Sequence, residues 1–205
     1  MLRSKSGAGV LALICAFVLA ALLAHPCPAR ADLSYDASRA YNTGDYPTAM
    51  RLFKQLAAAG DAYALCAMAT MHLNGWGTPK DPGEAFRLFG QAAGKGYALG
   101  AYNYGVCLRK GLGTPMDKQA ALKAFQKVLT LRDQSLVPAT MVVLGEMYAQ
   151  GEGVPRNDAE AYFYYNLAAQ LGEVRARTPR DELAKRLTPE QLKDANRVIM
   201  RWRED

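Results

Sequence analysis

A sequence motif that occurs three times constrains the fold of this chain of 205 residues more than any other feature. We call it the repeated phrase. Its copies start at Gly75, Gly111 and Gly151, and each reads Gly-x-Gly-x-Pro with Asp or Asn two residues after the proline. An alanine stands ten residues after the first glycine of every copy. Self-similarity at a fixed spacing of roughly 20–50 residues is the signature of a stacked repeat array. The sequence therefore predicts a repeat protein.

The residue types within the phrase predict a helix end, a turn and a new helix start. Glycine adopts positive φ without steric cost, and an X-Pro step stops the preceding helix from continuing. Asp81, Asp117 and Asn157 stand where a helix N-cap belongs, since their side chains can accept hydrogen bonds from unpaired backbone N–H groups. A Gly-x-Gly pair can also open a dinucleotide-binding loop, but that loop needs a preceding strand and a third glycine. Here a helical pattern precedes the glycines.

Apolar residues around each phrase recur at helical spacing. An aromatic residue stands 14 residues after the first glycine, with alanines or other small apolar residues one turn away. Offsets of three, four and seven residues share one helix face, and alanines opposite aromatics let two helices pack closely. Each period thus predicts an antiparallel helix pair, and the whole chain an all-α fold. The aromatic positions are Phe89, Phe125 and Tyr165.

A related unit precedes the first phrase, and the last period is longer than the one before it. Ala49 and Phe53 lie 36 residues before Ala85 and Phe89, so they predict an earlier second helix, after an opening at Gly44. The last period is 40 residues long instead of 36, and its additional residues fall between 130 and 138. We expect a longer loop there.

The residues from Thr140 to Asn157, and their continuation from Ala161 to Gly172, resemble Sel-1-like repeats, which are relatives of the tetratricopeptide repeat. The unit that opens at Gly44 is more similar to a tetratricopeptide repeat. The resemblance implies a right-handed α-α superhelix with repeats at about 33–60, 61–96, 97–134 and 135–172. Three residues depart from the pattern: His72 and Leu108 occupy an aromatic position, and Arg132 stands where the other copies carry glycine.

Residues 173–205 follow the last repeat and carry an apolar stripe at helical spacing. Thr178-Pro179 and Thr188-Pro189 predict helix starts, and Thr188 with Gln191 fits a capping box. An open array needs a terminal unit with a polar outer face, so we expect a helical cap. The alternative is an amphipathic tail that binds a partner. The stripe comprises Leu183, Leu187, Leu192, Ala195, Val198, Ile199 and Trp202.

Residues 1–31 have the features of a signal peptide. Arg3 and Lys5 precede an uncharged apolar run over residues 8–24, and Ala29-Arg30-Ala31 matches a cleavage site. We therefore expect a mature chain that begins at Asp32, in the periplasm or secreted, with membrane contact only through this segment before cleavage. An uncleaved anchor is the alternative, and a lipid-anchored Cys27 fits less well because of the residues before it.

Removal of that segment changes the charge and the cysteine content. The net charge of +6 falls to +3, with 22 basic and 19 acidic residues left, so nucleic acid is not expected as a partner. Cys66 and Cys107 are the cysteines that remain. We expect them on the first helices of two successive helix pairs, at different heights along those helices. This places their Cα atoms roughly 11–13 Å apart, which is too far for a disulfide bond. We expect Cys66 to be an accessible, reactive thiol and Cys107 a buried one.

The mature sequence contains few residues suited to catalysis. His72 is its one histidine, and its serines are Ser34, Ser38 and Ser135, none of which begins a Ser-x-x-Lys motif. We expect no metal site, no cofactor and no enzymatic activity. Two alternatives remain: a protein that binds the cell wall (peptidoglycan), and a β-lactamase-like hydrolase, which the resemblance suggests.

Binding is the remaining class of function, and the resemblance implies that the first helices of the pairs line a concave surface. We expect a protein or peptide partner there, held by tyrosines, leucines and a cationic pair. Ser34, Ser38, Tyr41 and Asn42 would extend this surface, and Ala149 and Gln150 would end it. The predicted binding residues are Tyr63, Cys66, Thr70, Leu73, Asn74, Leu99, Tyr102, Val106, Arg109, Lys110, Val142 and Glu146.

Substitutions in the predicted core and on the predicted binding surface should differ in their effect on the free energy of unfolding. Phe125 and Tyr165 are expected in the core, so Phe125→Ala should destabilise by about 3–5 kcal/mol. Arg109 is expected on a solvated face, so Arg109→Ala should change stability by no more than about 0.5 kcal/mol.

Overall fold

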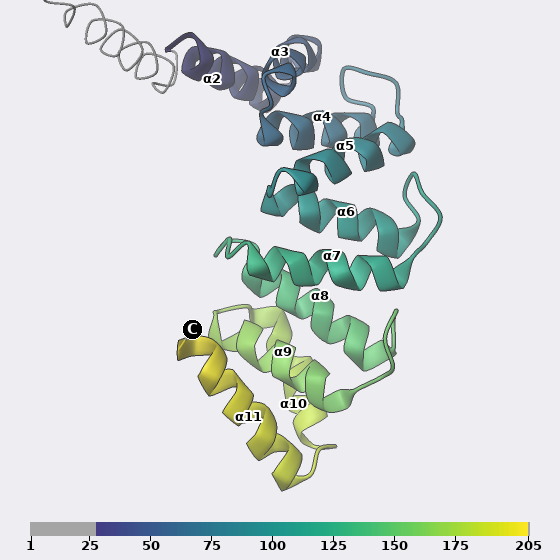
Figure 1. Ribbon diagram of the computed structural model, residues 1–205, viewed down its shortest axis with the longest axis vertical. Coiled ribbons are helices and arrows are strands. Elements are labelled where there is room, and N and C mark those ends of the chain that lie inside the picture. The colour runs from purple at the N-terminus through teal and green to yellow at the C-terminus, as the bar shows by residue number, and fades with distance from the viewer. Residues whose placement is uncertain (1–27, 205) are drawn as a thin grey trace, which may run out of the picture.

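The computed structural model describes the backbone of residues 28–204 and the side chains of residues 30–197. Helices are the only regular secondary structure in this part of the chain, and turns and loops connect them. The helices stack in consecutive antiparallel pairs along one axis (Figure 1). We call the first helix of each pair the A helix and the second the B helix. The pairs are α2 (Pro28–Thr43) with α3 (Tyr46–Ala58), α4 (Ala62–Asn74) with α5 (Pro82–Gly94), α6 (Ala98–Lys110) with α7 (Lys118–Thr130), and α8 (Val137–Gln150) with α9 (Asp158–Gln170).

The repeated phrase forms the A-to-B turn with the predicted chemistry. Its first glycine ends each A helix in the left-handed conformation, as at Gly111, where φ is +70° and the N–H donates to the Cys107 carbonyl. Its Asp or Asn then caps the B helix: Asp81 accepts from the Glu84 N–H at 2.9 Å, and Asp117 from the Ala120 N–H at 2.8 Å. The sequence expectation of a helix stop, turn and start is confirmed.

The second glycine of each phrase packs against the preceding repeat. A Cβ at Gly113 would overlap the carbonyl oxygen of Pro82, the first residue of helix α5. The backbone at Gly113 also has a φ of +71°, which L side chains rarely adopt. The phrase therefore sets the closest approach between neighbouring repeats. The equivalent contacts are Gly77 with Tyr46, Gly113 with Pro82, and Gly153 with Lys118.

The core follows the predicted aromatic positions of the B helices. Phe53 and Phe125 are fully buried, Phe89 is 2% exposed and Tyr165 is 5% exposed. A Cβ added at Gly105 on helix α6 would lie 3.0 Å from the Phe125 ring, so the glycine leaves room for that ring. The prediction of a core built from B-helix aromatics and A-helix small residues is confirmed.

The connection between helices α7 and α8 is longer than the other B-to-A connections, as expected. It runs over residues 131–136, whereas three residues, 95–97, join α5 to α6. Arg132 keeps a φ of +53° at the position where the other repeats have Gly60, Gly96 and Gly172. The left-handed turn thus persists without glycine at this one position.

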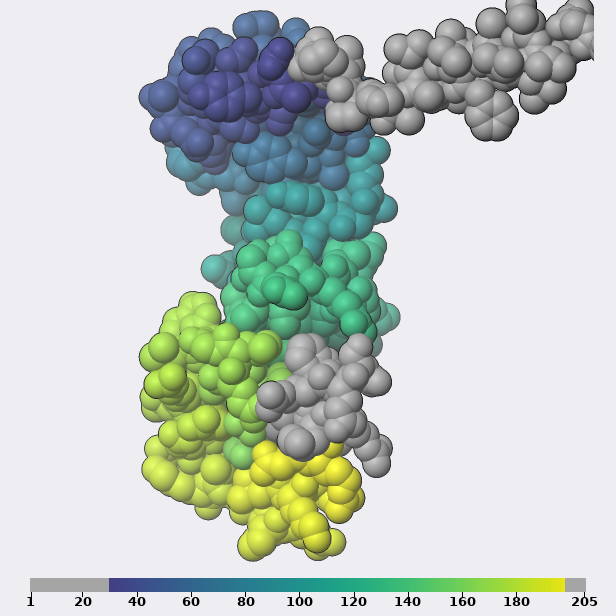
Figure 2. Space-filling view, turned by 90° about the vertical axis from the view of Figure 1, so that its left-hand side faces the viewer, coloured from purple at the N-terminus to yellow at the C-terminus, as the bar shows by residue number. Residues whose placement is uncertain are grey.

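The A helices lie on the inner side of the stack. Helix α4 contacts α6 directly, whereas a groove opens between the B helices α5 and α7. Elements that touch across repeats lie on the inner side of a curved array, and elements that separate lie on its outer side. The space-filling view shows the repeats in sequence order from the purple end at the top to the yellow end at the bottom, with the teal and green middle of the chain set back on the left edge (Figure 2).

Residues after 173 form a terminal unit on the last repeat. It consists of a short 3-10 turn, Val174–Ala176, then α10 (Arg177–Ala184) and α11 (Pro189–Glu204), and both α-helices contact α9. Thr188 and Gln191 exchange the two predicted hydrogen bonds at the start of α11, at 2.9 and 3.2 Å. Helix α10 begins at Arg177, two residues before Pro179, so Thr178 lies inside the helix and does not cap it as expected. Val198, Ile199 and Trp202 lie outside the described side chains.

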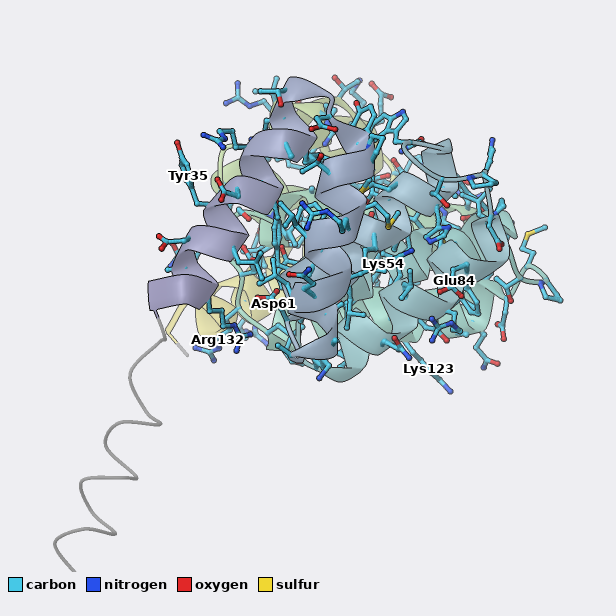
Figure 3. All side chains as sticks on the ribbon, turned by 90° about the horizontal axis from the view of Figure 1, so that it is seen from above. Tyr35, Lys54, Asp61, Glu84, Lys123 and Arg132 are labelled. Carbon is cyan, nitrogen blue, oxygen red and sulfur yellow. The ribbon has the colours of Figure 1, made fainter. Side chains whose placement is uncertain are left out.

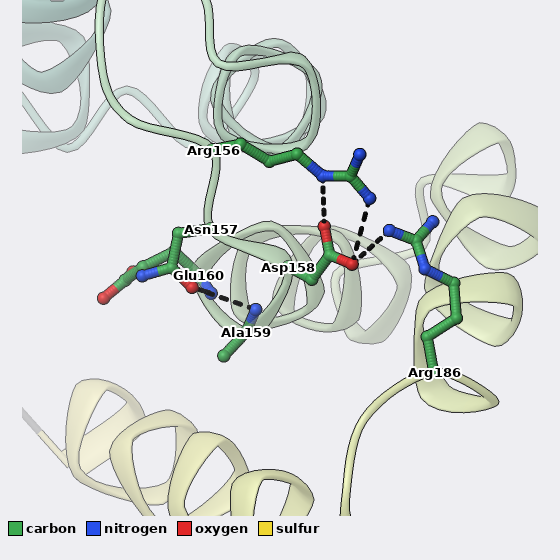
Figure 4. A network of polar contacts seen from close by, with 6 residues as sticks. All are labelled: Arg156, Asn157, Asp158, Ala159, Glu160 and Arg186. Atoms are coloured by element: carbon green, nitrogen blue, oxygen red, sulfur yellow. Dashed lines mark hydrogen bonds and ion pairs between the residues drawn. The ribbon is translucent and has the colours of Figure 1, made fainter.

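Two polar clusters fasten this terminal unit to helix α9. Asn166, which is 8% exposed, donates to the Asn196 side chain on α11 at 3.0 Å. At the N-terminal end of α9, Arg156 and Arg186 approach the Asp158 carboxylate from opposite sides (Figure 4). Hydrogen bonding to Arg156 holds the pKa of Asp158 below its usual value, against a smaller opposing effect of burial. Asn196 thereby attaches helix α11, and Arg186 the segment after α10, to the last repeat.

Candidate functional site

We define the inner face as the exposed and partly buried side chains of the A helices α4, α6 and α8 at four recurring positions, which lie 12, 8, 5 and 1 residues before the first glycine of the phrase. On α6, residues 99, 103, 106 and 110 follow one another at intervals of three or four, so they form one stripe along the helix. The same positions recur on α4 and α8, and the inner face thus runs across three repeats. Its residues are Tyr63, Thr70, Asn74, Leu99, Asn103, Val106, Lys110, Ala139, Val143, Glu146 and Gln150.

Two predicted binding residues are not exposed on this face. Cys66 is 2% exposed and Val142 is 7% exposed, so the expectation of accessible side chains at these positions is wrong. Both stand nine residues before the first glycine of their phrase, at the edge of the A helix. At Cys66 that edge is covered by the next A helix, where the Asn103 amide lies 3.9 Å from the sulfur atom. Leu73, Tyr102 and Arg109 are partly buried along the same edge.

Asn103 belongs to the inner face but is missing from the predicted set. It stands eight residues before Gly111, at a position where the other repeats carry Ala67 and Val143. The periodic pattern could have found it, because a stripe at intervals of three and four residues that includes 99, 106 and 110 also includes 103. The sequence reasoning placed the centre of the stripe too close to the buried edge.

Aromatic rings mark the N-terminal end of the inner face. Tyr63, which is 39% exposed, packs edge-to-face on Phe53 at 5.8 Å and on Tyr97 at 6.4 Å between ring centroids. Tyr41 on α2 lies edge-to-face against Phe53 at 6.1 Å. Tyrosines with a buried base and an accessible edge combine apolar area with a hydrogen-bonding group, which suits contact with a peptide.

A network of four charges closes the other end. Arg109 on α6 donates to Glu146 on α8 at 2.9 Å and to Glu152 in the following turn at 2.7 Å. Lys118, the first residue of α7, donates to the second oxygen of Glu152 at 2.8 Å. The Arg109 and Glu152 side chains are only 19% and 16% exposed. The expectation of a solvated Arg109 is therefore wrong, because this residue joins two repeats.

Burial and ion pairing act in opposite directions on Glu152. Burial alone would raise the pKa of this carboxyl, but hydrogen bonds from Lys118 and Arg109 outweigh it and hold the pKa below the usual value. Burial likewise opposes the charged form of Arg109, and its bonds to Glu152 and Glu146 raise the pKa of the guanidinium. Both groups stay charged at neutral pH, and each depends on the other.

We expect Arg109→Ala to destabilise the fold by about 1–2 kcal/mol at pH 7, because Glu152 would lose one of its two cationic partners. The folded-state pKa of Glu152 is lowered, so its contribution is complete above the usual glutamate pKa of about 4.3 and is lost as the pH falls through the folded value. Urea denaturation at several pH values should show the difference between wild type and variant shrinking on acidification. Lys110→Ala, an exposed neighbour, is the control, with a change below about 0.5 kcal/mol. Equal effects of the two changes would contradict the network.

Neither of the two cysteines among the described residues, Cys66 and Cys107, is suited to reaction with a thiol reagent. Both are buried and free of a disulfide. Burial raises the pKa of the Cys66 thiol to about 11, against a smaller lowering by the hydrogen bond from Asn103, and burial also raises the pKa of Cys107 to about 11. At pH 8 about one such thiol in a thousand is ionised, and the thiolate is the reactive form.

We therefore expect a maleimide reagent to label Cys66 and Cys107 slowly in the native protein and rapidly in urea. Mass spectrometry at timed intervals measures this. Lys110→Cys supplies an exposed thiol as the reference and should react at once. Labelling of native Cys66 at the rate of that reference would show that the edge position of the A helix is open.

Within residues 30–197, no group of histidine, cysteine, aspartate and glutamate side chains is placed to hold a metal ion. No helix among the described residues has the length and apolar character needed to cross a membrane. The inner face itself carries an exposed tyrosine edge, short polar side chains and an ionic network at one end.

Comparisons with known proteins agree with this architecture. The family model described as Sel1 repeat matches residues 34–61, 62–97, 98–127 and 138–173. A solved structure of a protective antigen present in uropathogenic Escherichia coli strains, displaying an SLR fold, is 26% identical over 77% of this chain, with a TM-score of 0.67. A Sel1 repeat protein from Oxalobacter formigenes is 23% identical over 73% of the chain, with a TM-score of 0.64, and shows the fold alone. The chain spans 33% of the first structure and 58% of the second. No curated protein matches the chain.

Proposed function

The chain belongs to the Sel1 repeat family, and from this premise we propose that it is a non-enzymatic adaptor of the cell envelope, which binds a protein or peptide partner on its inner face. Proteins of this family are typically scaffolds for protein–protein interaction. The observation that carries the proposal is the inner face itself: one stripe of exposed and partly buried side chains that crosses three repeats.

The composition of the inner face favours a peptide over a small molecule. It extends over three repeats, with Tyr63 at one end, Thr70 and Asn103 in the middle, and Glu146 beside Arg109 at the other end. Concave surfaces of repeat arrays bind extended or helical segments, with aromatic residues as anchors. The ionic network holds the fourth repeat against the third, so the far end of the surface keeps its shape.

An envelope location rests on the sequence of residues 1–31, most of which lie outside the described residues. Cleavage after Ala31 would remove the first four residues of helix α2. Arg30 and its 3.6 Å ion pair with Asp61 would be lost, but Asp61 would keep its cap bond to the Ala64 N–H.

We expect intact-mass measurement of protein recovered from the cell envelope to give a chain that begins at Asp32, because Ala29-Arg30-Ala31 fits signal-peptidase specificity. Ala31→Arg should block cleavage and yield the full-length mass. Recovery of the unaltered sequence as a full-length species held in the membrane would instead indicate an uncleaved anchor.

The function is tested by immobilising the mature protein against envelope extract and, separately, against purified peptidoglycan. The proposal expects specific protein partners that are lost in Val106→Glu, a charge change in the middle of the inner face, and kept in Lys54→Glu on helix α3. Retention on peptidoglycan without protein partners would support the alternative of a cell-wall-binding protein.

A further inference from the structure

A second surface, on the outer side of the stack, has a charge pattern that the inner face lacks. The B helices α3, α5 and α7 together carry six basic residues and one acidic residue, Glu84. Helix α9 reverses this, with Asp158 and Glu160 and no basic residue. One basic side chain recurs at the same position in each of the first three repeats, 36 residues apart. These residues are Arg51, Arg87 and Lys123.

A groove of about 640 Å³ lies within this basic surface, between helices α5 and α7 with α6 as its floor. The Phe86 and Tyr104 rings stack there at 4.8 Å between centroids. Four alanines and two glycines supply the rest of the apolar lining, and no acidic side chain lines the groove within the described residues. The volume falls within the range of roughly 300–1,000 Å³ that is usual for binding sites. The small residues are Gly90, Ala93, Gly94, Ala101, Ala120 and Ala124.

The glycines keep this groove open. A Cβ at Gly90 would lie 3.1 Å from the Tyr104 ring, so a side chain there would press on the floor. A Cβ at Gly94 would meet no atom within 4 Å, so the space beside it is empty. Glycine inside a helix costs about 1 kcal/mol relative to alanine. Gly90 thus leaves room for the Tyr104 ring at the expense of helix stability, and Gly94, the last residue of α5, leaves open space at that end of the groove.

Three cations border the groove, and one of them has no partner. Arg87 pairs with Glu84 at 2.6 Å, and the Lys127 ammonium donates to the Ala93 carbonyl at 3.1 Å. Lys123 makes no ion pair or hydrogen bond within residues 30–197. Looking down the stack, Lys123 and Glu84 lie on the same side of the molecule, remote from Tyr35 on α2 (Figure 3).

We propose that this outer groove between α5 and α7 is a second docking site, which binds an amphipathic helix with an acidic polar face. An apolar groove between two helices accepts the apolar side of a third helix, and the basic border pairs with acids along its flanks. A flat bilayer surface could not enter the hollow. The apolar floor likewise offers nothing to a phosphate backbone, which the border alone would attract.

The probe is a synthetic peptide of about 18 residues, made of glutamate, alanine and leucine, with the leucines on one helical face. Its binding to the purified protein is followed by fluorescence anisotropy, beside a peptide of the same composition with scrambled leucines. We expect at least about tenfold tighter binding of the amphipathic peptide. Gly94→Leu, which fills the open space and favours the helix, and Lys123→Glu should each weaken it at least about tenfold.

Lys54→Glu is the matched control, since it makes the same charge change on a B helix away from the groove, and its effect should stay within about twofold. Circular dichroism verifies that each variant is folded, and if Lys123→Glu is not, Gly94→Leu decides alone. Equal binding of the scrambled peptide, or equal loss in Lys54→Glu, would overturn the proposal. The proposal would also be overturned if Gly94→Leu and Lys123→Glu bound the peptide as tightly as the wild type but lost binding to phosphatidylglycerol vesicles or single-stranded DNA. All these positions lie outside the inner face, so the outcome is independent of whether that face binds a partner.

Discussion

Gly113→Ala is expected to destabilise the protein by at least about 3 kcal/mol, although it adds a single methyl group at the surface. Two costs combine at this residue. Its φ of +71° is unfavourable for any L side chain, and the added Cβ would overlap the Pro82 carbonyl group, which is backbone and cannot rotate away. The repeats would have to separate, so the inter-repeat contact would be lost as well.

Gly111→Ala is the matched control, two residues earlier in the same phrase. Its φ of +70° is nearly identical, but the nearest atom to an added Cβ, the Thr114 carbonyl oxygen, lies 3.4 Å away. The cost should be that of the backbone conformation alone, about 1–2 kcal/mol. Chemical denaturation of both variants measures the difference. Similar values for the two would show that the second glycine does not set the spacing of the repeats.

Phe125→Ala should destabilise by about 3–5 kcal/mol, as expected from the sequence and now from the contacts. The ring is fully buried in the third repeat, packs edge-to-face on Tyr102 at 5.5 Å and lies against Gly105. Loss of the ring would remove these contacts and leave a cavity in the core. Phe125→Leu, which keeps most of the volume, should cost clearly less, and an equal loss in both would indicate that the ring is not the packing element.

The parts of this fold that follow local rules could be predicted from the sequence. The three turns, their caps at Asp81, Asp117 and Asn157, and the aromatic core depend on residues close together in the chain. The capping box at Thr188 is equally local. The phrase occurs three times, so the same residue types at the same positions indicate the same turn in each repeat.

The candidate site could be predicted only in part, because the burial of an A-helix edge depends on the neighbouring repeat. Cys66 was expected to be accessible, but the covering residue, Asn103, comes 37 residues later. Arg109 was expected in solvent, but its partner Glu152 is 43 residues away in the next turn. Periodicity identifies the least buried stripe of a helix, and it does not show how closely the next helix approaches the edge of that stripe.

Site-specific photo-crosslinking in the cell envelope tests directly whether a partner binds the inner face. A photoreactive amino acid is placed at Val106, in the middle of the inner face, and in a second variant at Lys54 on the outer side. We expect a discrete crosslinked protein from Val106 that is absent from Lys54. Crosslinks of equal yield from both positions, or none from Val106 while Lys54 captures a protein, would contradict binding of a partner on the inner face.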